Sequence, residues 1–387
     1  MDAPKHLHFT PDEFAARQAA ARQELRARDL DALLIFRQES MFYLTGYDTF
    51  GYVYFQCLVL TADGRMTLLT RAPDYRQAHF TSTIDDIRVW VDRPDANPAH
   101  DLREILGELG LFGSALGVEY NAYGLTAELA QHLQAALPGF ARLENASDLV
   151  SRLRLIKSPF EMTYVRKAAE LGDAAWQAAC DTTGVGAFEG DILAAMHGAI
   201  YRGGGDDPAN EFIIGSGPGA MMCRYFTGRR HIDAQDQLTL EFAGAYRHYH
   251  ACLMRTIAIG TPPARQRELW DRARDALLAC EAALRPGSTV GDVFAAHAKT
   301  LDAAGLSRYR LNACGYSVGT TFAPNWMDWP MVFADNPTVL APGMVFFLHM
   351  IIFDDDSGLA ATLGRTSLVT ETGSEPLSQA SLELVVR

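Results

Sequence analysis

The sequence lacks the features that mark secreted, membrane-spanning and nucleic-acid-binding proteins. Its first residues contain no apolar core of the kind a signal peptide needs, and no apolar run reaches the length of a membrane span. Basic residues are outnumbered, with 34 Lys and Arg against 47 Asp and Glu, so the formal net charge is −13. An acidic surface repels phosphate backbones. These absences predict a cytoplasmic protein that binds neither nucleic acid nor membrane.

Cysteine is also scarce, and its spacing matches no metal or redox motif. The six cysteines are scattered along 387 residues and form no C-x-x-C pair. In a long chain without a secretion signal, such residues are expected to be reduced thiols, most of them packed as small core side chains. The remaining composition is that of an ordinary globular protein, 48% hydrophobic and 21% charged, and the length suits two domains.

The first part of the chain predicts an α/β domain. Thr10 to Glu13 offer a helix N-cap, a proline at the first helical position and a capping glutamate. Beyond this helix, apolar strand-like segments alternate with helical ones, and such alternation favours a layered α/β domain. The expected strands are 30–36, 57–60, 66–69, 87–91 and 116–119, and the expected helices are 100–110 and 124–136.

A boundary near 150–157 separates this part from a second one. Ser158-Pro159-Phe160-Glu161 is a capping box with proline inside it, and it predicts a long helix to about Cys180. A loop with two tryptophans is expected at 325–329. Further helices are expected at 188–201, 264–285 and 290–304, and strands at 211–214, 237–242, 251–259, 344–352 and 367–370.

Four segments of the second part place polar groups inside apolar strands. Burying such groups is costly unless they are paired or used, so these segments are candidates for a functional site. The segments are 237–244 with Glu241, 246–256 with His250, Cys252 and Arg255, 314–321 with Tyr316, and 342–350 with His349.

In this order, the segments resemble the creatinase, prolidase and methionine-aminopeptidase family. The resemblance covers nearly the whole chain and includes Tyr43-Leu44-Thr45-Gly46-Tyr47, Arg154 to Glu161, Pro342-Gly343-Met344-Val345 and Gly364 to Thr370. It implies an α+β protein with a smaller N-terminal α/β domain, residues 1–152, and a C-terminal pita-bread domain, residues 153–387, in which helices cover a curved antiparallel sheet. It also implies a homodimer in which the first domain and the tryptophan segment complete the partner's pocket.

Metal-dependent members of this family have five ligands, and the resemblance implies that none is retained. The matching positions are Glu241, Cys252, Tyr316, His349 and Gly364. A two-metal site needs bridging carboxylates, and one carboxylate remains. The chain therefore resembles the branches that work without metal or cofactor, creatinase and ectoine hydrolase.

One departure from those branches concerns substrate binding. Where both have a catalytic histidine eight residues after a Ser-Gly pair, Ser216-Gly217 here leads to Arg224. A bidentate guanidinium at this place suits an anionic substrate group.

The resulting hypothesis is hydrolysis of a C–N bond, in an amidine, guanidine or amide group, of a small zwitterionic metabolite. Glu241 would act as general base or nucleophile, and His349 would move the proton to the leaving nitrogen. Tyr316 and His250 would orient the substrate or stabilise developing charge. The expected substrate-binding residues are Arg224, Arg255, Cys252, Trp326 and Tyr52.

Other interpretations of the same residues stay open. Glu241 and Arg255 could form a structural ion pair, and Arg224 could be an ordinary salt-bridge residue. Glu241, Cys252 and His349 could hold a single zinc ion in an Xaa-Pro dipeptidase-like peptidase. The chain could also bind a small molecule without transforming it.

Overall fold

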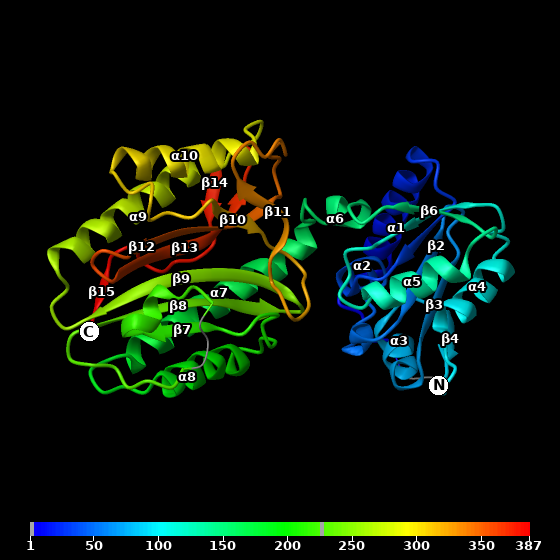
Figure 1. Ribbon diagram of the computed structural model, residues 1–387, viewed down its shortest axis with the longest axis horizontal. Coiled ribbons are helices and arrows are strands. Elements are labelled where there is room, and N and C mark those ends of the chain that lie inside the picture. Colours follow the sequence, from blue (N-terminus) through cyan, green and yellow to red (C-terminus); the bar gives the residue numbers. More distant parts are fainter. Residues whose placement is uncertain (1–3, 225–227) are drawn as a thin grey trace. The chain divides into compact units, whose positions relative to one another are not determined.

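The computed structural model describes residues 4–224 and 228–387, and the chain divides into two compact units, Met1–Arg154 and Leu155–Arg387. Figure 1 shows that each unit has its own sheet and its own helices. The expected α+β organisation is confirmed, with an α/β unit first and an antiparallel sheet second.

The N-terminal unit is built on a six-stranded mixed sheet in the order β4-β3-β2-β1-β5-β6. Alternate residues of β1 lie in two different cores, with Leu33 and Ile35 on one face and Ala32 and Leu34 on the other. Burial on both faces explains why this strand is apolar throughout rather than alternating. The strands are β1 (Ala32–Ile35), β2 (Cys57–Thr61), β3 (Met66–Arg71), β4 (Asp86–Trp90), β5 (Ala115–Val118) and β6 (Arg142–Asn145).

Helices cover this sheet, and the first of them begins where the sequence predicts. Thr10 caps α1 by accepting a hydrogen bond from the Glu13 amide. The helices are α1 (Pro11–Ala27), α2 (Gln38–Thr45), α3 (Tyr75–Thr81), α4 (Pro98–Glu108), α5 (Ala127–Ala136) and α6 (Leu149–Leu153), with short 3-10 turns η1 (Gly51–Val53) and η2 (Ala72–Asp74).

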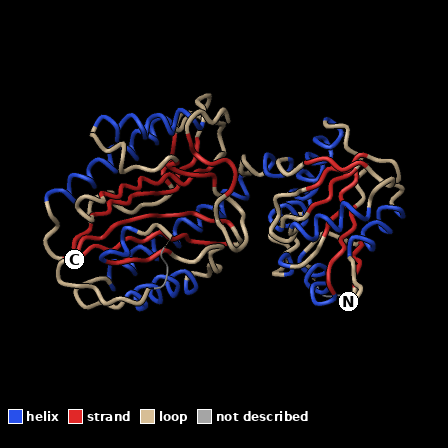
Figure 2. Tube along the Cα trace, viewed as in Figure 1, coloured by secondary structure: helices blue, strands red, loops and turns tan. Residues whose placement is uncertain are grey.

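The C-terminal unit contains a nine-stranded sheet, whose main path runs β11-β10-β12-β13-β9-β8-β7 (Figure 2). Neighbours along this path pair antiparallel, while β15 adds to β9 in parallel. The strands are β7 (Ile213–Ser216), β8 (Asp236–Tyr246), β9 (Tyr249–Ile259), β10 (Ala313–Ser317), β11 (Asp328–Phe333), β12 (Val345–Asp354), β13 (Leu359–Val369), β14 (Ser374–Pro376) and β15 (Val385–Val386).

Helices α7 and α9 pack on the same face of this sheet. Gly244 of β8 lies so close to α7 that an added Cβ would meet the Ala168 carbonyl oxygen. Trp176 of α7 stacks on Phe242 of β8, while Glu281 of α9 pairs with Arg365 of β13. The helices are α7 (Pro159–Thr182), α8 (Glu189–Arg202), α9 (Ala264–Ala283) and α10 (Val290–Ala303), with the 3-10 turn η3 (Gly217–Met221).

Because strand side chains alternate between faces, the residues between these helix-facing positions point the other way. Glu241 pairs with Met254, and Met254 pairs with Gly364. Gly364 pairs in turn with His349. Directly paired residues share a face, so these four positions cross the sheet in one row on the side away from α7 and α9.

The expected loop at 325–329 is only partly correct. Its last residues, Asp328 and Trp329, begin the edge strand β11. The pairing of β11 with β10 has irregular register on both sides of Tyr316.

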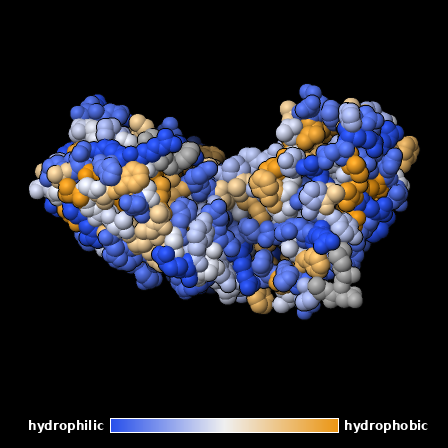
Figure 3. All heavy atoms as spheres, turned by 90° about the horizontal axis from the view of Figure 1, so that it is seen from below, coloured by the Kyte–Doolittle hydropathy of each residue, from blue (hydrophilic) through white to orange (hydrophobic). Residues whose placement is uncertain are grey.

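Every helix in the described part of the chain is too short or too polar to be a membrane span. Figure 3 shows hydrophilic and hydrophobic residues interspersed on the face of each unit that it draws.

Replacing Gly244 with alanine tests the close packing of α7 on β8. The new methyl group would lie 1.9 Å from a main-chain oxygen of α7, so strand and helix must separate. We expect Gly244→Ala to lower the free energy of unfolding by about 1–3 kcal/mol. Gly373→Ala is the matched control, because a Cβ there meets nothing within 4 Å. Equal urea midpoints for the two variants would contradict this packing.

Candidate active site

A cavity of about 350 Å³ lies in the C-terminal unit on the side of the sheet away from α7 and α9, where Glu241 and His349 line it. Five of the nine predicted site residues line it. Its volume falls in the range of small-molecule sites, and its walls combine apolar side chains with a few convergent polar groups. The five residues are Arg224, Glu241, Tyr316, Trp326 and His349.

Glu241 is the acidic residue of this cavity and lies near the middle of β8. It is 8% exposed, and burial raises the pKa of its carboxyl to about 7. The Tyr316 hydroxyl donates to its Oε1 atom over 3.1 Å, and this hydrogen bond and the charge of Arg224 both lower the same pKa. The result is a carboxyl group that can take up and release a proton near neutral pH.

Tyr316 is held in place by a second hydrogen bond. The indole Nε1 of Trp326 donates to the Tyr316 hydroxyl oxygen over 2.8 Å. Because an indole can only donate, the hydroxyl accepts from Trp326 and keeps its own hydrogen for Glu241. Both rings are buried, so this chain of donors fixes the orientation of the carboxyl.

His349 lies on β12, and its ring packs beside that of Tyr316, with 5.6 Å between ring centroids. Burial, and after it the charges of His297 and Arg224, lower the pKa of the imidazole to about 3. The ring is therefore neutral at physiological pH. Its Nδ1 atom is buried and has no hydrogen-bond partner within the described residues, while other atoms of the residue line the cavity. These properties favour Glu241 over His349 as the group that protonates a leaving nitrogen.

Arg224 supplies the positive charge at the cavity. It is exposed, and none of the ion pairs between described residues includes it. Within the described part of the chain, Arg224 therefore has no ion-pair partner that would make it an ordinary salt-bridge residue. Three asparagine side chains, Asn210, Asn312 and Asn325, add neutral amide groups to the same cavity.

Arg255 does not reach the cavity, contrary to its expected role as a carboxylate clamp. Since Glu241 pairs with Met254, the side chain of Arg255 points to the helix side of the sheet. Its guanidinium donates to the carbonyl oxygens of Met254, over 2.8 Å, and Gly364. It lies 5.8 Å from the Trp176 ring centroid, and burial lowers its pKa to about 9. The same geometry argues against an ion pair between Glu241 and Arg255.

His250 is also placed outside the cavity lining. Its Nε2 accepts a hydrogen bond from the Ala209 amide over 3.0 Å, so the neutral ring carries its hydrogen on Nδ1, which lies 3.1 Å from the Thr321 hydroxyl. Burial lowers the pKa of this imidazole to about 4. With both nitrogens engaged, His250 is a positioning residue that holds the chain beside Asn210.

Cys252 is buried and does not line the cavity either. Cys252 lies beside Glu241, and burial together with that carboxyl keeps its thiol pKa well above the usual value. Tyr52 belongs to the N-terminal unit, where burial raises its pKa to about 12. Its contact with substrate stays a prediction.

Sequence reasoning missed the asparagines and Cys223, which also lines the cavity. Asparagine is a common turn residue, so its presence in a loop carries no signal of function. Asn325 stands directly before Trp326, and that position next to a predicted site residue is the one hint the sequence offers.

The side chains at the five expected metal positions do not fit a metal centre. A Cβ on Gly364 would lie 2.7 Å from the Leu348 carbonyl oxygen and 2.9 Å from the Phe347 ring, so a longer ligand has no room there. Burial keeps the Tyr316 hydroxyl and the Cys252 thiol protonated by raising both pKa values. Within residues 4–224 and 228–387, no three His, Cys, Asp or Glu side chains are grouped so that they could hold an ion.

Comparison with models of known protein families identifies the family of this chain. Residues 163–371 match the model described as metallopeptidase family M24, and residues 17–156 match that of the creatinase/prolidase N-terminal domain. The chain belongs to metallopeptidase family M24, and the resemblance inferred from the sequence is confirmed at the level of the family.

Several relatives match over nearly their full length. An uncharacterized hydrolase/peptidase, y4tM, of Sinorhizobium fredii is 30% identical over 98% of this chain and 99% of its own. The ectoine hydrolase of Halomonas elongata is 29% identical over the same shares. The crystal structure of dipeptidase PepE from Mycobacterium ulcerans has a TM-score of 0.84 at 26% identity and covers 98% of this chain and 99% of that one.

The buried carboxyl makes stability depend on pH in a defined direction. The pKa of Glu241 is about 7 in the folded chain, against an ordinary value of 4.5, so ionisation destabilises the fold as pH rises between these values. Glu241→Gln removes this cost. We expect the variant to be more stable than wild type by up to about 3 kcal/mol at pH 8, with no such gain near pH 4.5.

Chemical unfolding at both pH values measures this difference. Glu371→Gln, at an exposed position of the same unit, is the control and should show no gain at either pH. A Glu241→Gln variant that is equally stable, or less stable, at pH 8 would mean that the carboxyl ionises at its ordinary pH.

Proposed function

We propose that this chain hydrolyses a C–N bond of a small zwitterionic metabolite without a dinuclear metal centre. The chain is a hydrolase of family M24, and its relatives include proteins named ectoine hydrolase and Xaa-Pro dipeptidase. The observation that supports this proposal most directly is the lone carboxyl of Glu241, buried in a substrate-sized cavity with a pKa of about 7.

The charges in the cavity support a zwitterionic substrate of matching polarity. Arg224, exposed at the cavity, would bind a carboxylate through two parallel hydrogen bonds. The nitrogen of the scissile amide, amidine or guanidine group would then lie toward Glu241. The asparagine amides can donate to and accept from the uncharged parts of the molecule.

Glu241 would carry the proton through the reaction. Its carboxylate takes a proton from water, and the water oxygen forms a bond to the carbon of the C–N group, giving a tetrahedral adduct. The C–N bond then breaks, its electron pair stays with nitrogen, and Glu241 returns the proton to that nitrogen. The neutral His349, which lines the cavity, would hydrogen-bond the adduct, while Tyr316 keeps the carboxyl oriented.

Replacement of Glu241 tests its role in catalysis. We expect Glu241→Gln to lower kcat by about 10²–10⁴-fold, because the amide cannot accept the water proton. The assay is product analysis by mass spectrometry after incubation with ectoines, guanidino acids, cyclic amides and Xaa-Pro dipeptides, with and without chelator. Glu371→Gln should retain full activity.

The outcome of this assay also separates the alternatives. Turnover at the wild-type rate by Glu241→Gln contradicts the assignment. Dipeptide cleavage that stops with chelator indicates a metallopeptidase, and a ligand bound and recovered unchanged indicates a binding protein.

The pH profile tests the hydrogen bond between Tyr316 and Glu241. Since the ionised carboxylate is the base, kcat/KM should rise with pH through about 7. The Tyr316 hydroxyl lowers this pKa, so Tyr316→Phe should move the rising limb to higher pH, and Trp326→Phe should move it less in the same direction. A rising limb near pH 4.5, or an unmoved limb in Tyr316→Phe, would disagree with this role.

The homodimer and the part played by Tyr52 are proposed on the family resemblance. If two copies share their pockets, Tyr52→Phe should raise KM while kcat changes little. Sedimentation equilibrium of the full chain measures the assembly itself.

A further inference from the structure

The lining of the candidate active site changes in character across the sheet. Glu241 of β8, Asn210 before β7 and Arg224 after η3 line the cavity near the edge strand β7. The strands β10, β11 and β12, which also line it, form the opposite end of the sheet path. Tyr316 joins the two sides, because its hydroxyl reaches Glu241 from β10. The two charged groups, Arg224 and Glu241, thus define a charged side of the cavity.

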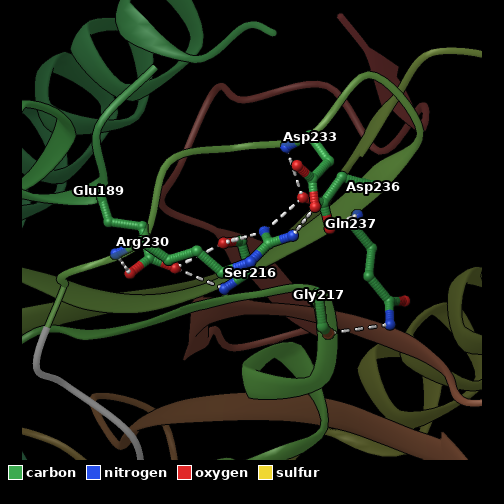
Figure 4. Close-up of polar contacts among 7 residues, drawn as sticks. All are labelled: Glu189, Ser216, Gly217, Arg230, Asp233, Asp236 and Gln237. Atoms are coloured by element: carbon green, nitrogen blue, oxygen red, sulfur yellow. Dashed lines mark hydrogen bonds and ion pairs between the residues drawn. The ribbon is translucent and has the colours of Figure 1, made fainter. Parts of the chain in front are cut away.

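Two anchors hold the chain before and after Arg224. The Glu189 carboxylate accepts hydrogen bonds from the Ser216 amide over 2.7 Å and from the Arg230 amide over 2.9 Å. The Arg230 guanidinium bonds in turn to the Ser216 hydroxyl over 2.8 Å and pairs with Asp236 of β8, and Figure 4 shows these contacts together. The chain on both sides of Arg224 is therefore fixed beside β7 and β8.

Apolar side chains line the part of the cavity that β10, β11 and β12 supply. Ile351 lies two residues beyond His349 on β12, so both face the cavity. Leu311 adjoins the bridge that joins β12 to the residues before β10. Met331 of β11 pairs with Tyr316 of β10. These residues from three adjoining strands form one continuous wall.

This apolar side of the cavity, made of Leu311, Met327, Met331 and Ile351, presents accessible hydrophobic surface. Leu311 is 37% exposed, and both methionines are half-buried. Sites for small molecules combine such surface with a few polar groups, and methionine side chains adapt to the shape of a bound group. The apolar side is therefore suited to cover an apolar part of the substrate.

A positive charge has no counter-ion on the apolar side. Of the described residues that line the cavity, Glu241 is the one acid, and it belongs to the charged side. An ammonium group beside Leu311 or Met331 would lose hydration without gaining an ion pair. The ammonium group of a zwitterionic substrate is therefore expected on the same side as its carboxylate.

We propose that the substrate is an N-acyl diamino acid, with both charges on the nitrogen side of the scissile bond and an uncharged apolar acyl group on the carbon side. This substrate class rests on the proposed function, in which Arg224 binds the carboxylate and the leaving nitrogen lies toward Glu241. The acyl group then lies against Leu311, Met331 and Ile351. Hydrolysis adds the oxygen of water to the acyl carbon and returns the proton to nitrogen, which releases an apolar carboxylic acid and a diamino acid.

Hydrolysis of three Nδ-acyl ornithines by the full chain tests this substrate class, with released ornithine as the measurement. The acyl groups are acetyl, butyryl and β-alanyl, and β-alanyl differs from butyryl by an ammonium group in place of the terminal methyl. Because butyryl buries two more carbons than acetyl, its kcat/KM should be about tenfold higher. The β-alanyl compound should be cleaved with a kcat/KM about 100-fold below that of the butyryl compound, since its ammonium group is unpaired.

A carboxylate added to the apolar side should change this preference. Met331→Glu and Leu311→Glu introduce it at half-buried and exposed positions, where the fold tolerates a charge. Each variant should lower the ratio of butyryl to β-alanyl cleavage at least about tenfold, because the new carboxylate pairs with the ammonium group. Leu278→Glu, at an exposed position of α9 outside the cavity lining, is the matched control and should keep the wild-type ratio.

Binding to Glu241→Gln separates the substrate class from the proposed hydrolysis, because binding needs no turnover. Isothermal titration calorimetry should show that this variant binds butyrylornithine at least about tenfold more tightly than β-alanylornithine. If this preference is present but wild type hydrolyses no compound, the hydrolysis is contradicted and the ligand class is supported. The substrate class is overturned if wild type hydrolyses ectoines, guanidino acids or dipeptides but not butyrylornithine. It is also overturned if wild type treats the butyryl and β-alanyl compounds alike, or if Met331→Glu and Leu311→Glu both keep the wild-type ratio.

Discussion

The hydrogen bond from Tyr316 to Glu241 is the interaction on which the candidate active site depends. A carboxylate on a buried strand loses the hydrogen bonds that water would give it. Among the described residues, no cation forms an ion pair with Glu241. The Tyr316 hydroxyl, itself held by Trp326, replaces part of the lost hydration. As a result, the carboxyl pKa is about 7, above the ordinary value for a glutamate. Its capacity for proton transfer at neutral pH follows from this incomplete compensation.

The sheet converts this local balance into a cavity. Strands β8, β12 and β13 present Glu241, His349 and Gly364 on one face, while α7 and α9 cover the other. His349 pairs with Gly364, which has no side chain to cover it. On the other face of the sheet, the Arg255 guanidinium donates a hydrogen bond to the Gly364 carbonyl oxygen. The helix side of the sheet thus fixes the strand positions whose opposite side forms the cavity floor.

Much of the fold, and five of the residues that line the cavity, could be predicted from the sequence. Capping residues and apolar periodicity located α1, α7 and most of β9 and β12, because these signals are local, whereas only the last residues of β13 were predicted. Glu241 and His349 were found because a polar residue within an apolar strand stands out. Arg255 was misplaced because its face depends on how β9 pairs with β8, which requires the register of a hairpin. Asn210 and Asn312 were missed because only tertiary contacts bring these loop residues to the cavity.

The proposed chemistry requires a carboxyl that titrates near neutrality without a metal ion to hold it ionised. Infrared difference spectroscopy of the protein labelled with ¹³C-glutamate, compared with Glu241→Gln, measures the protonation of this one group directly. We expect the carboxylate band assigned to Glu241 to appear with a midpoint near pH 7, and we expect chelator to leave this midpoint unchanged. A midpoint below about pH 5, or one that rises when chelator is added, would contradict it.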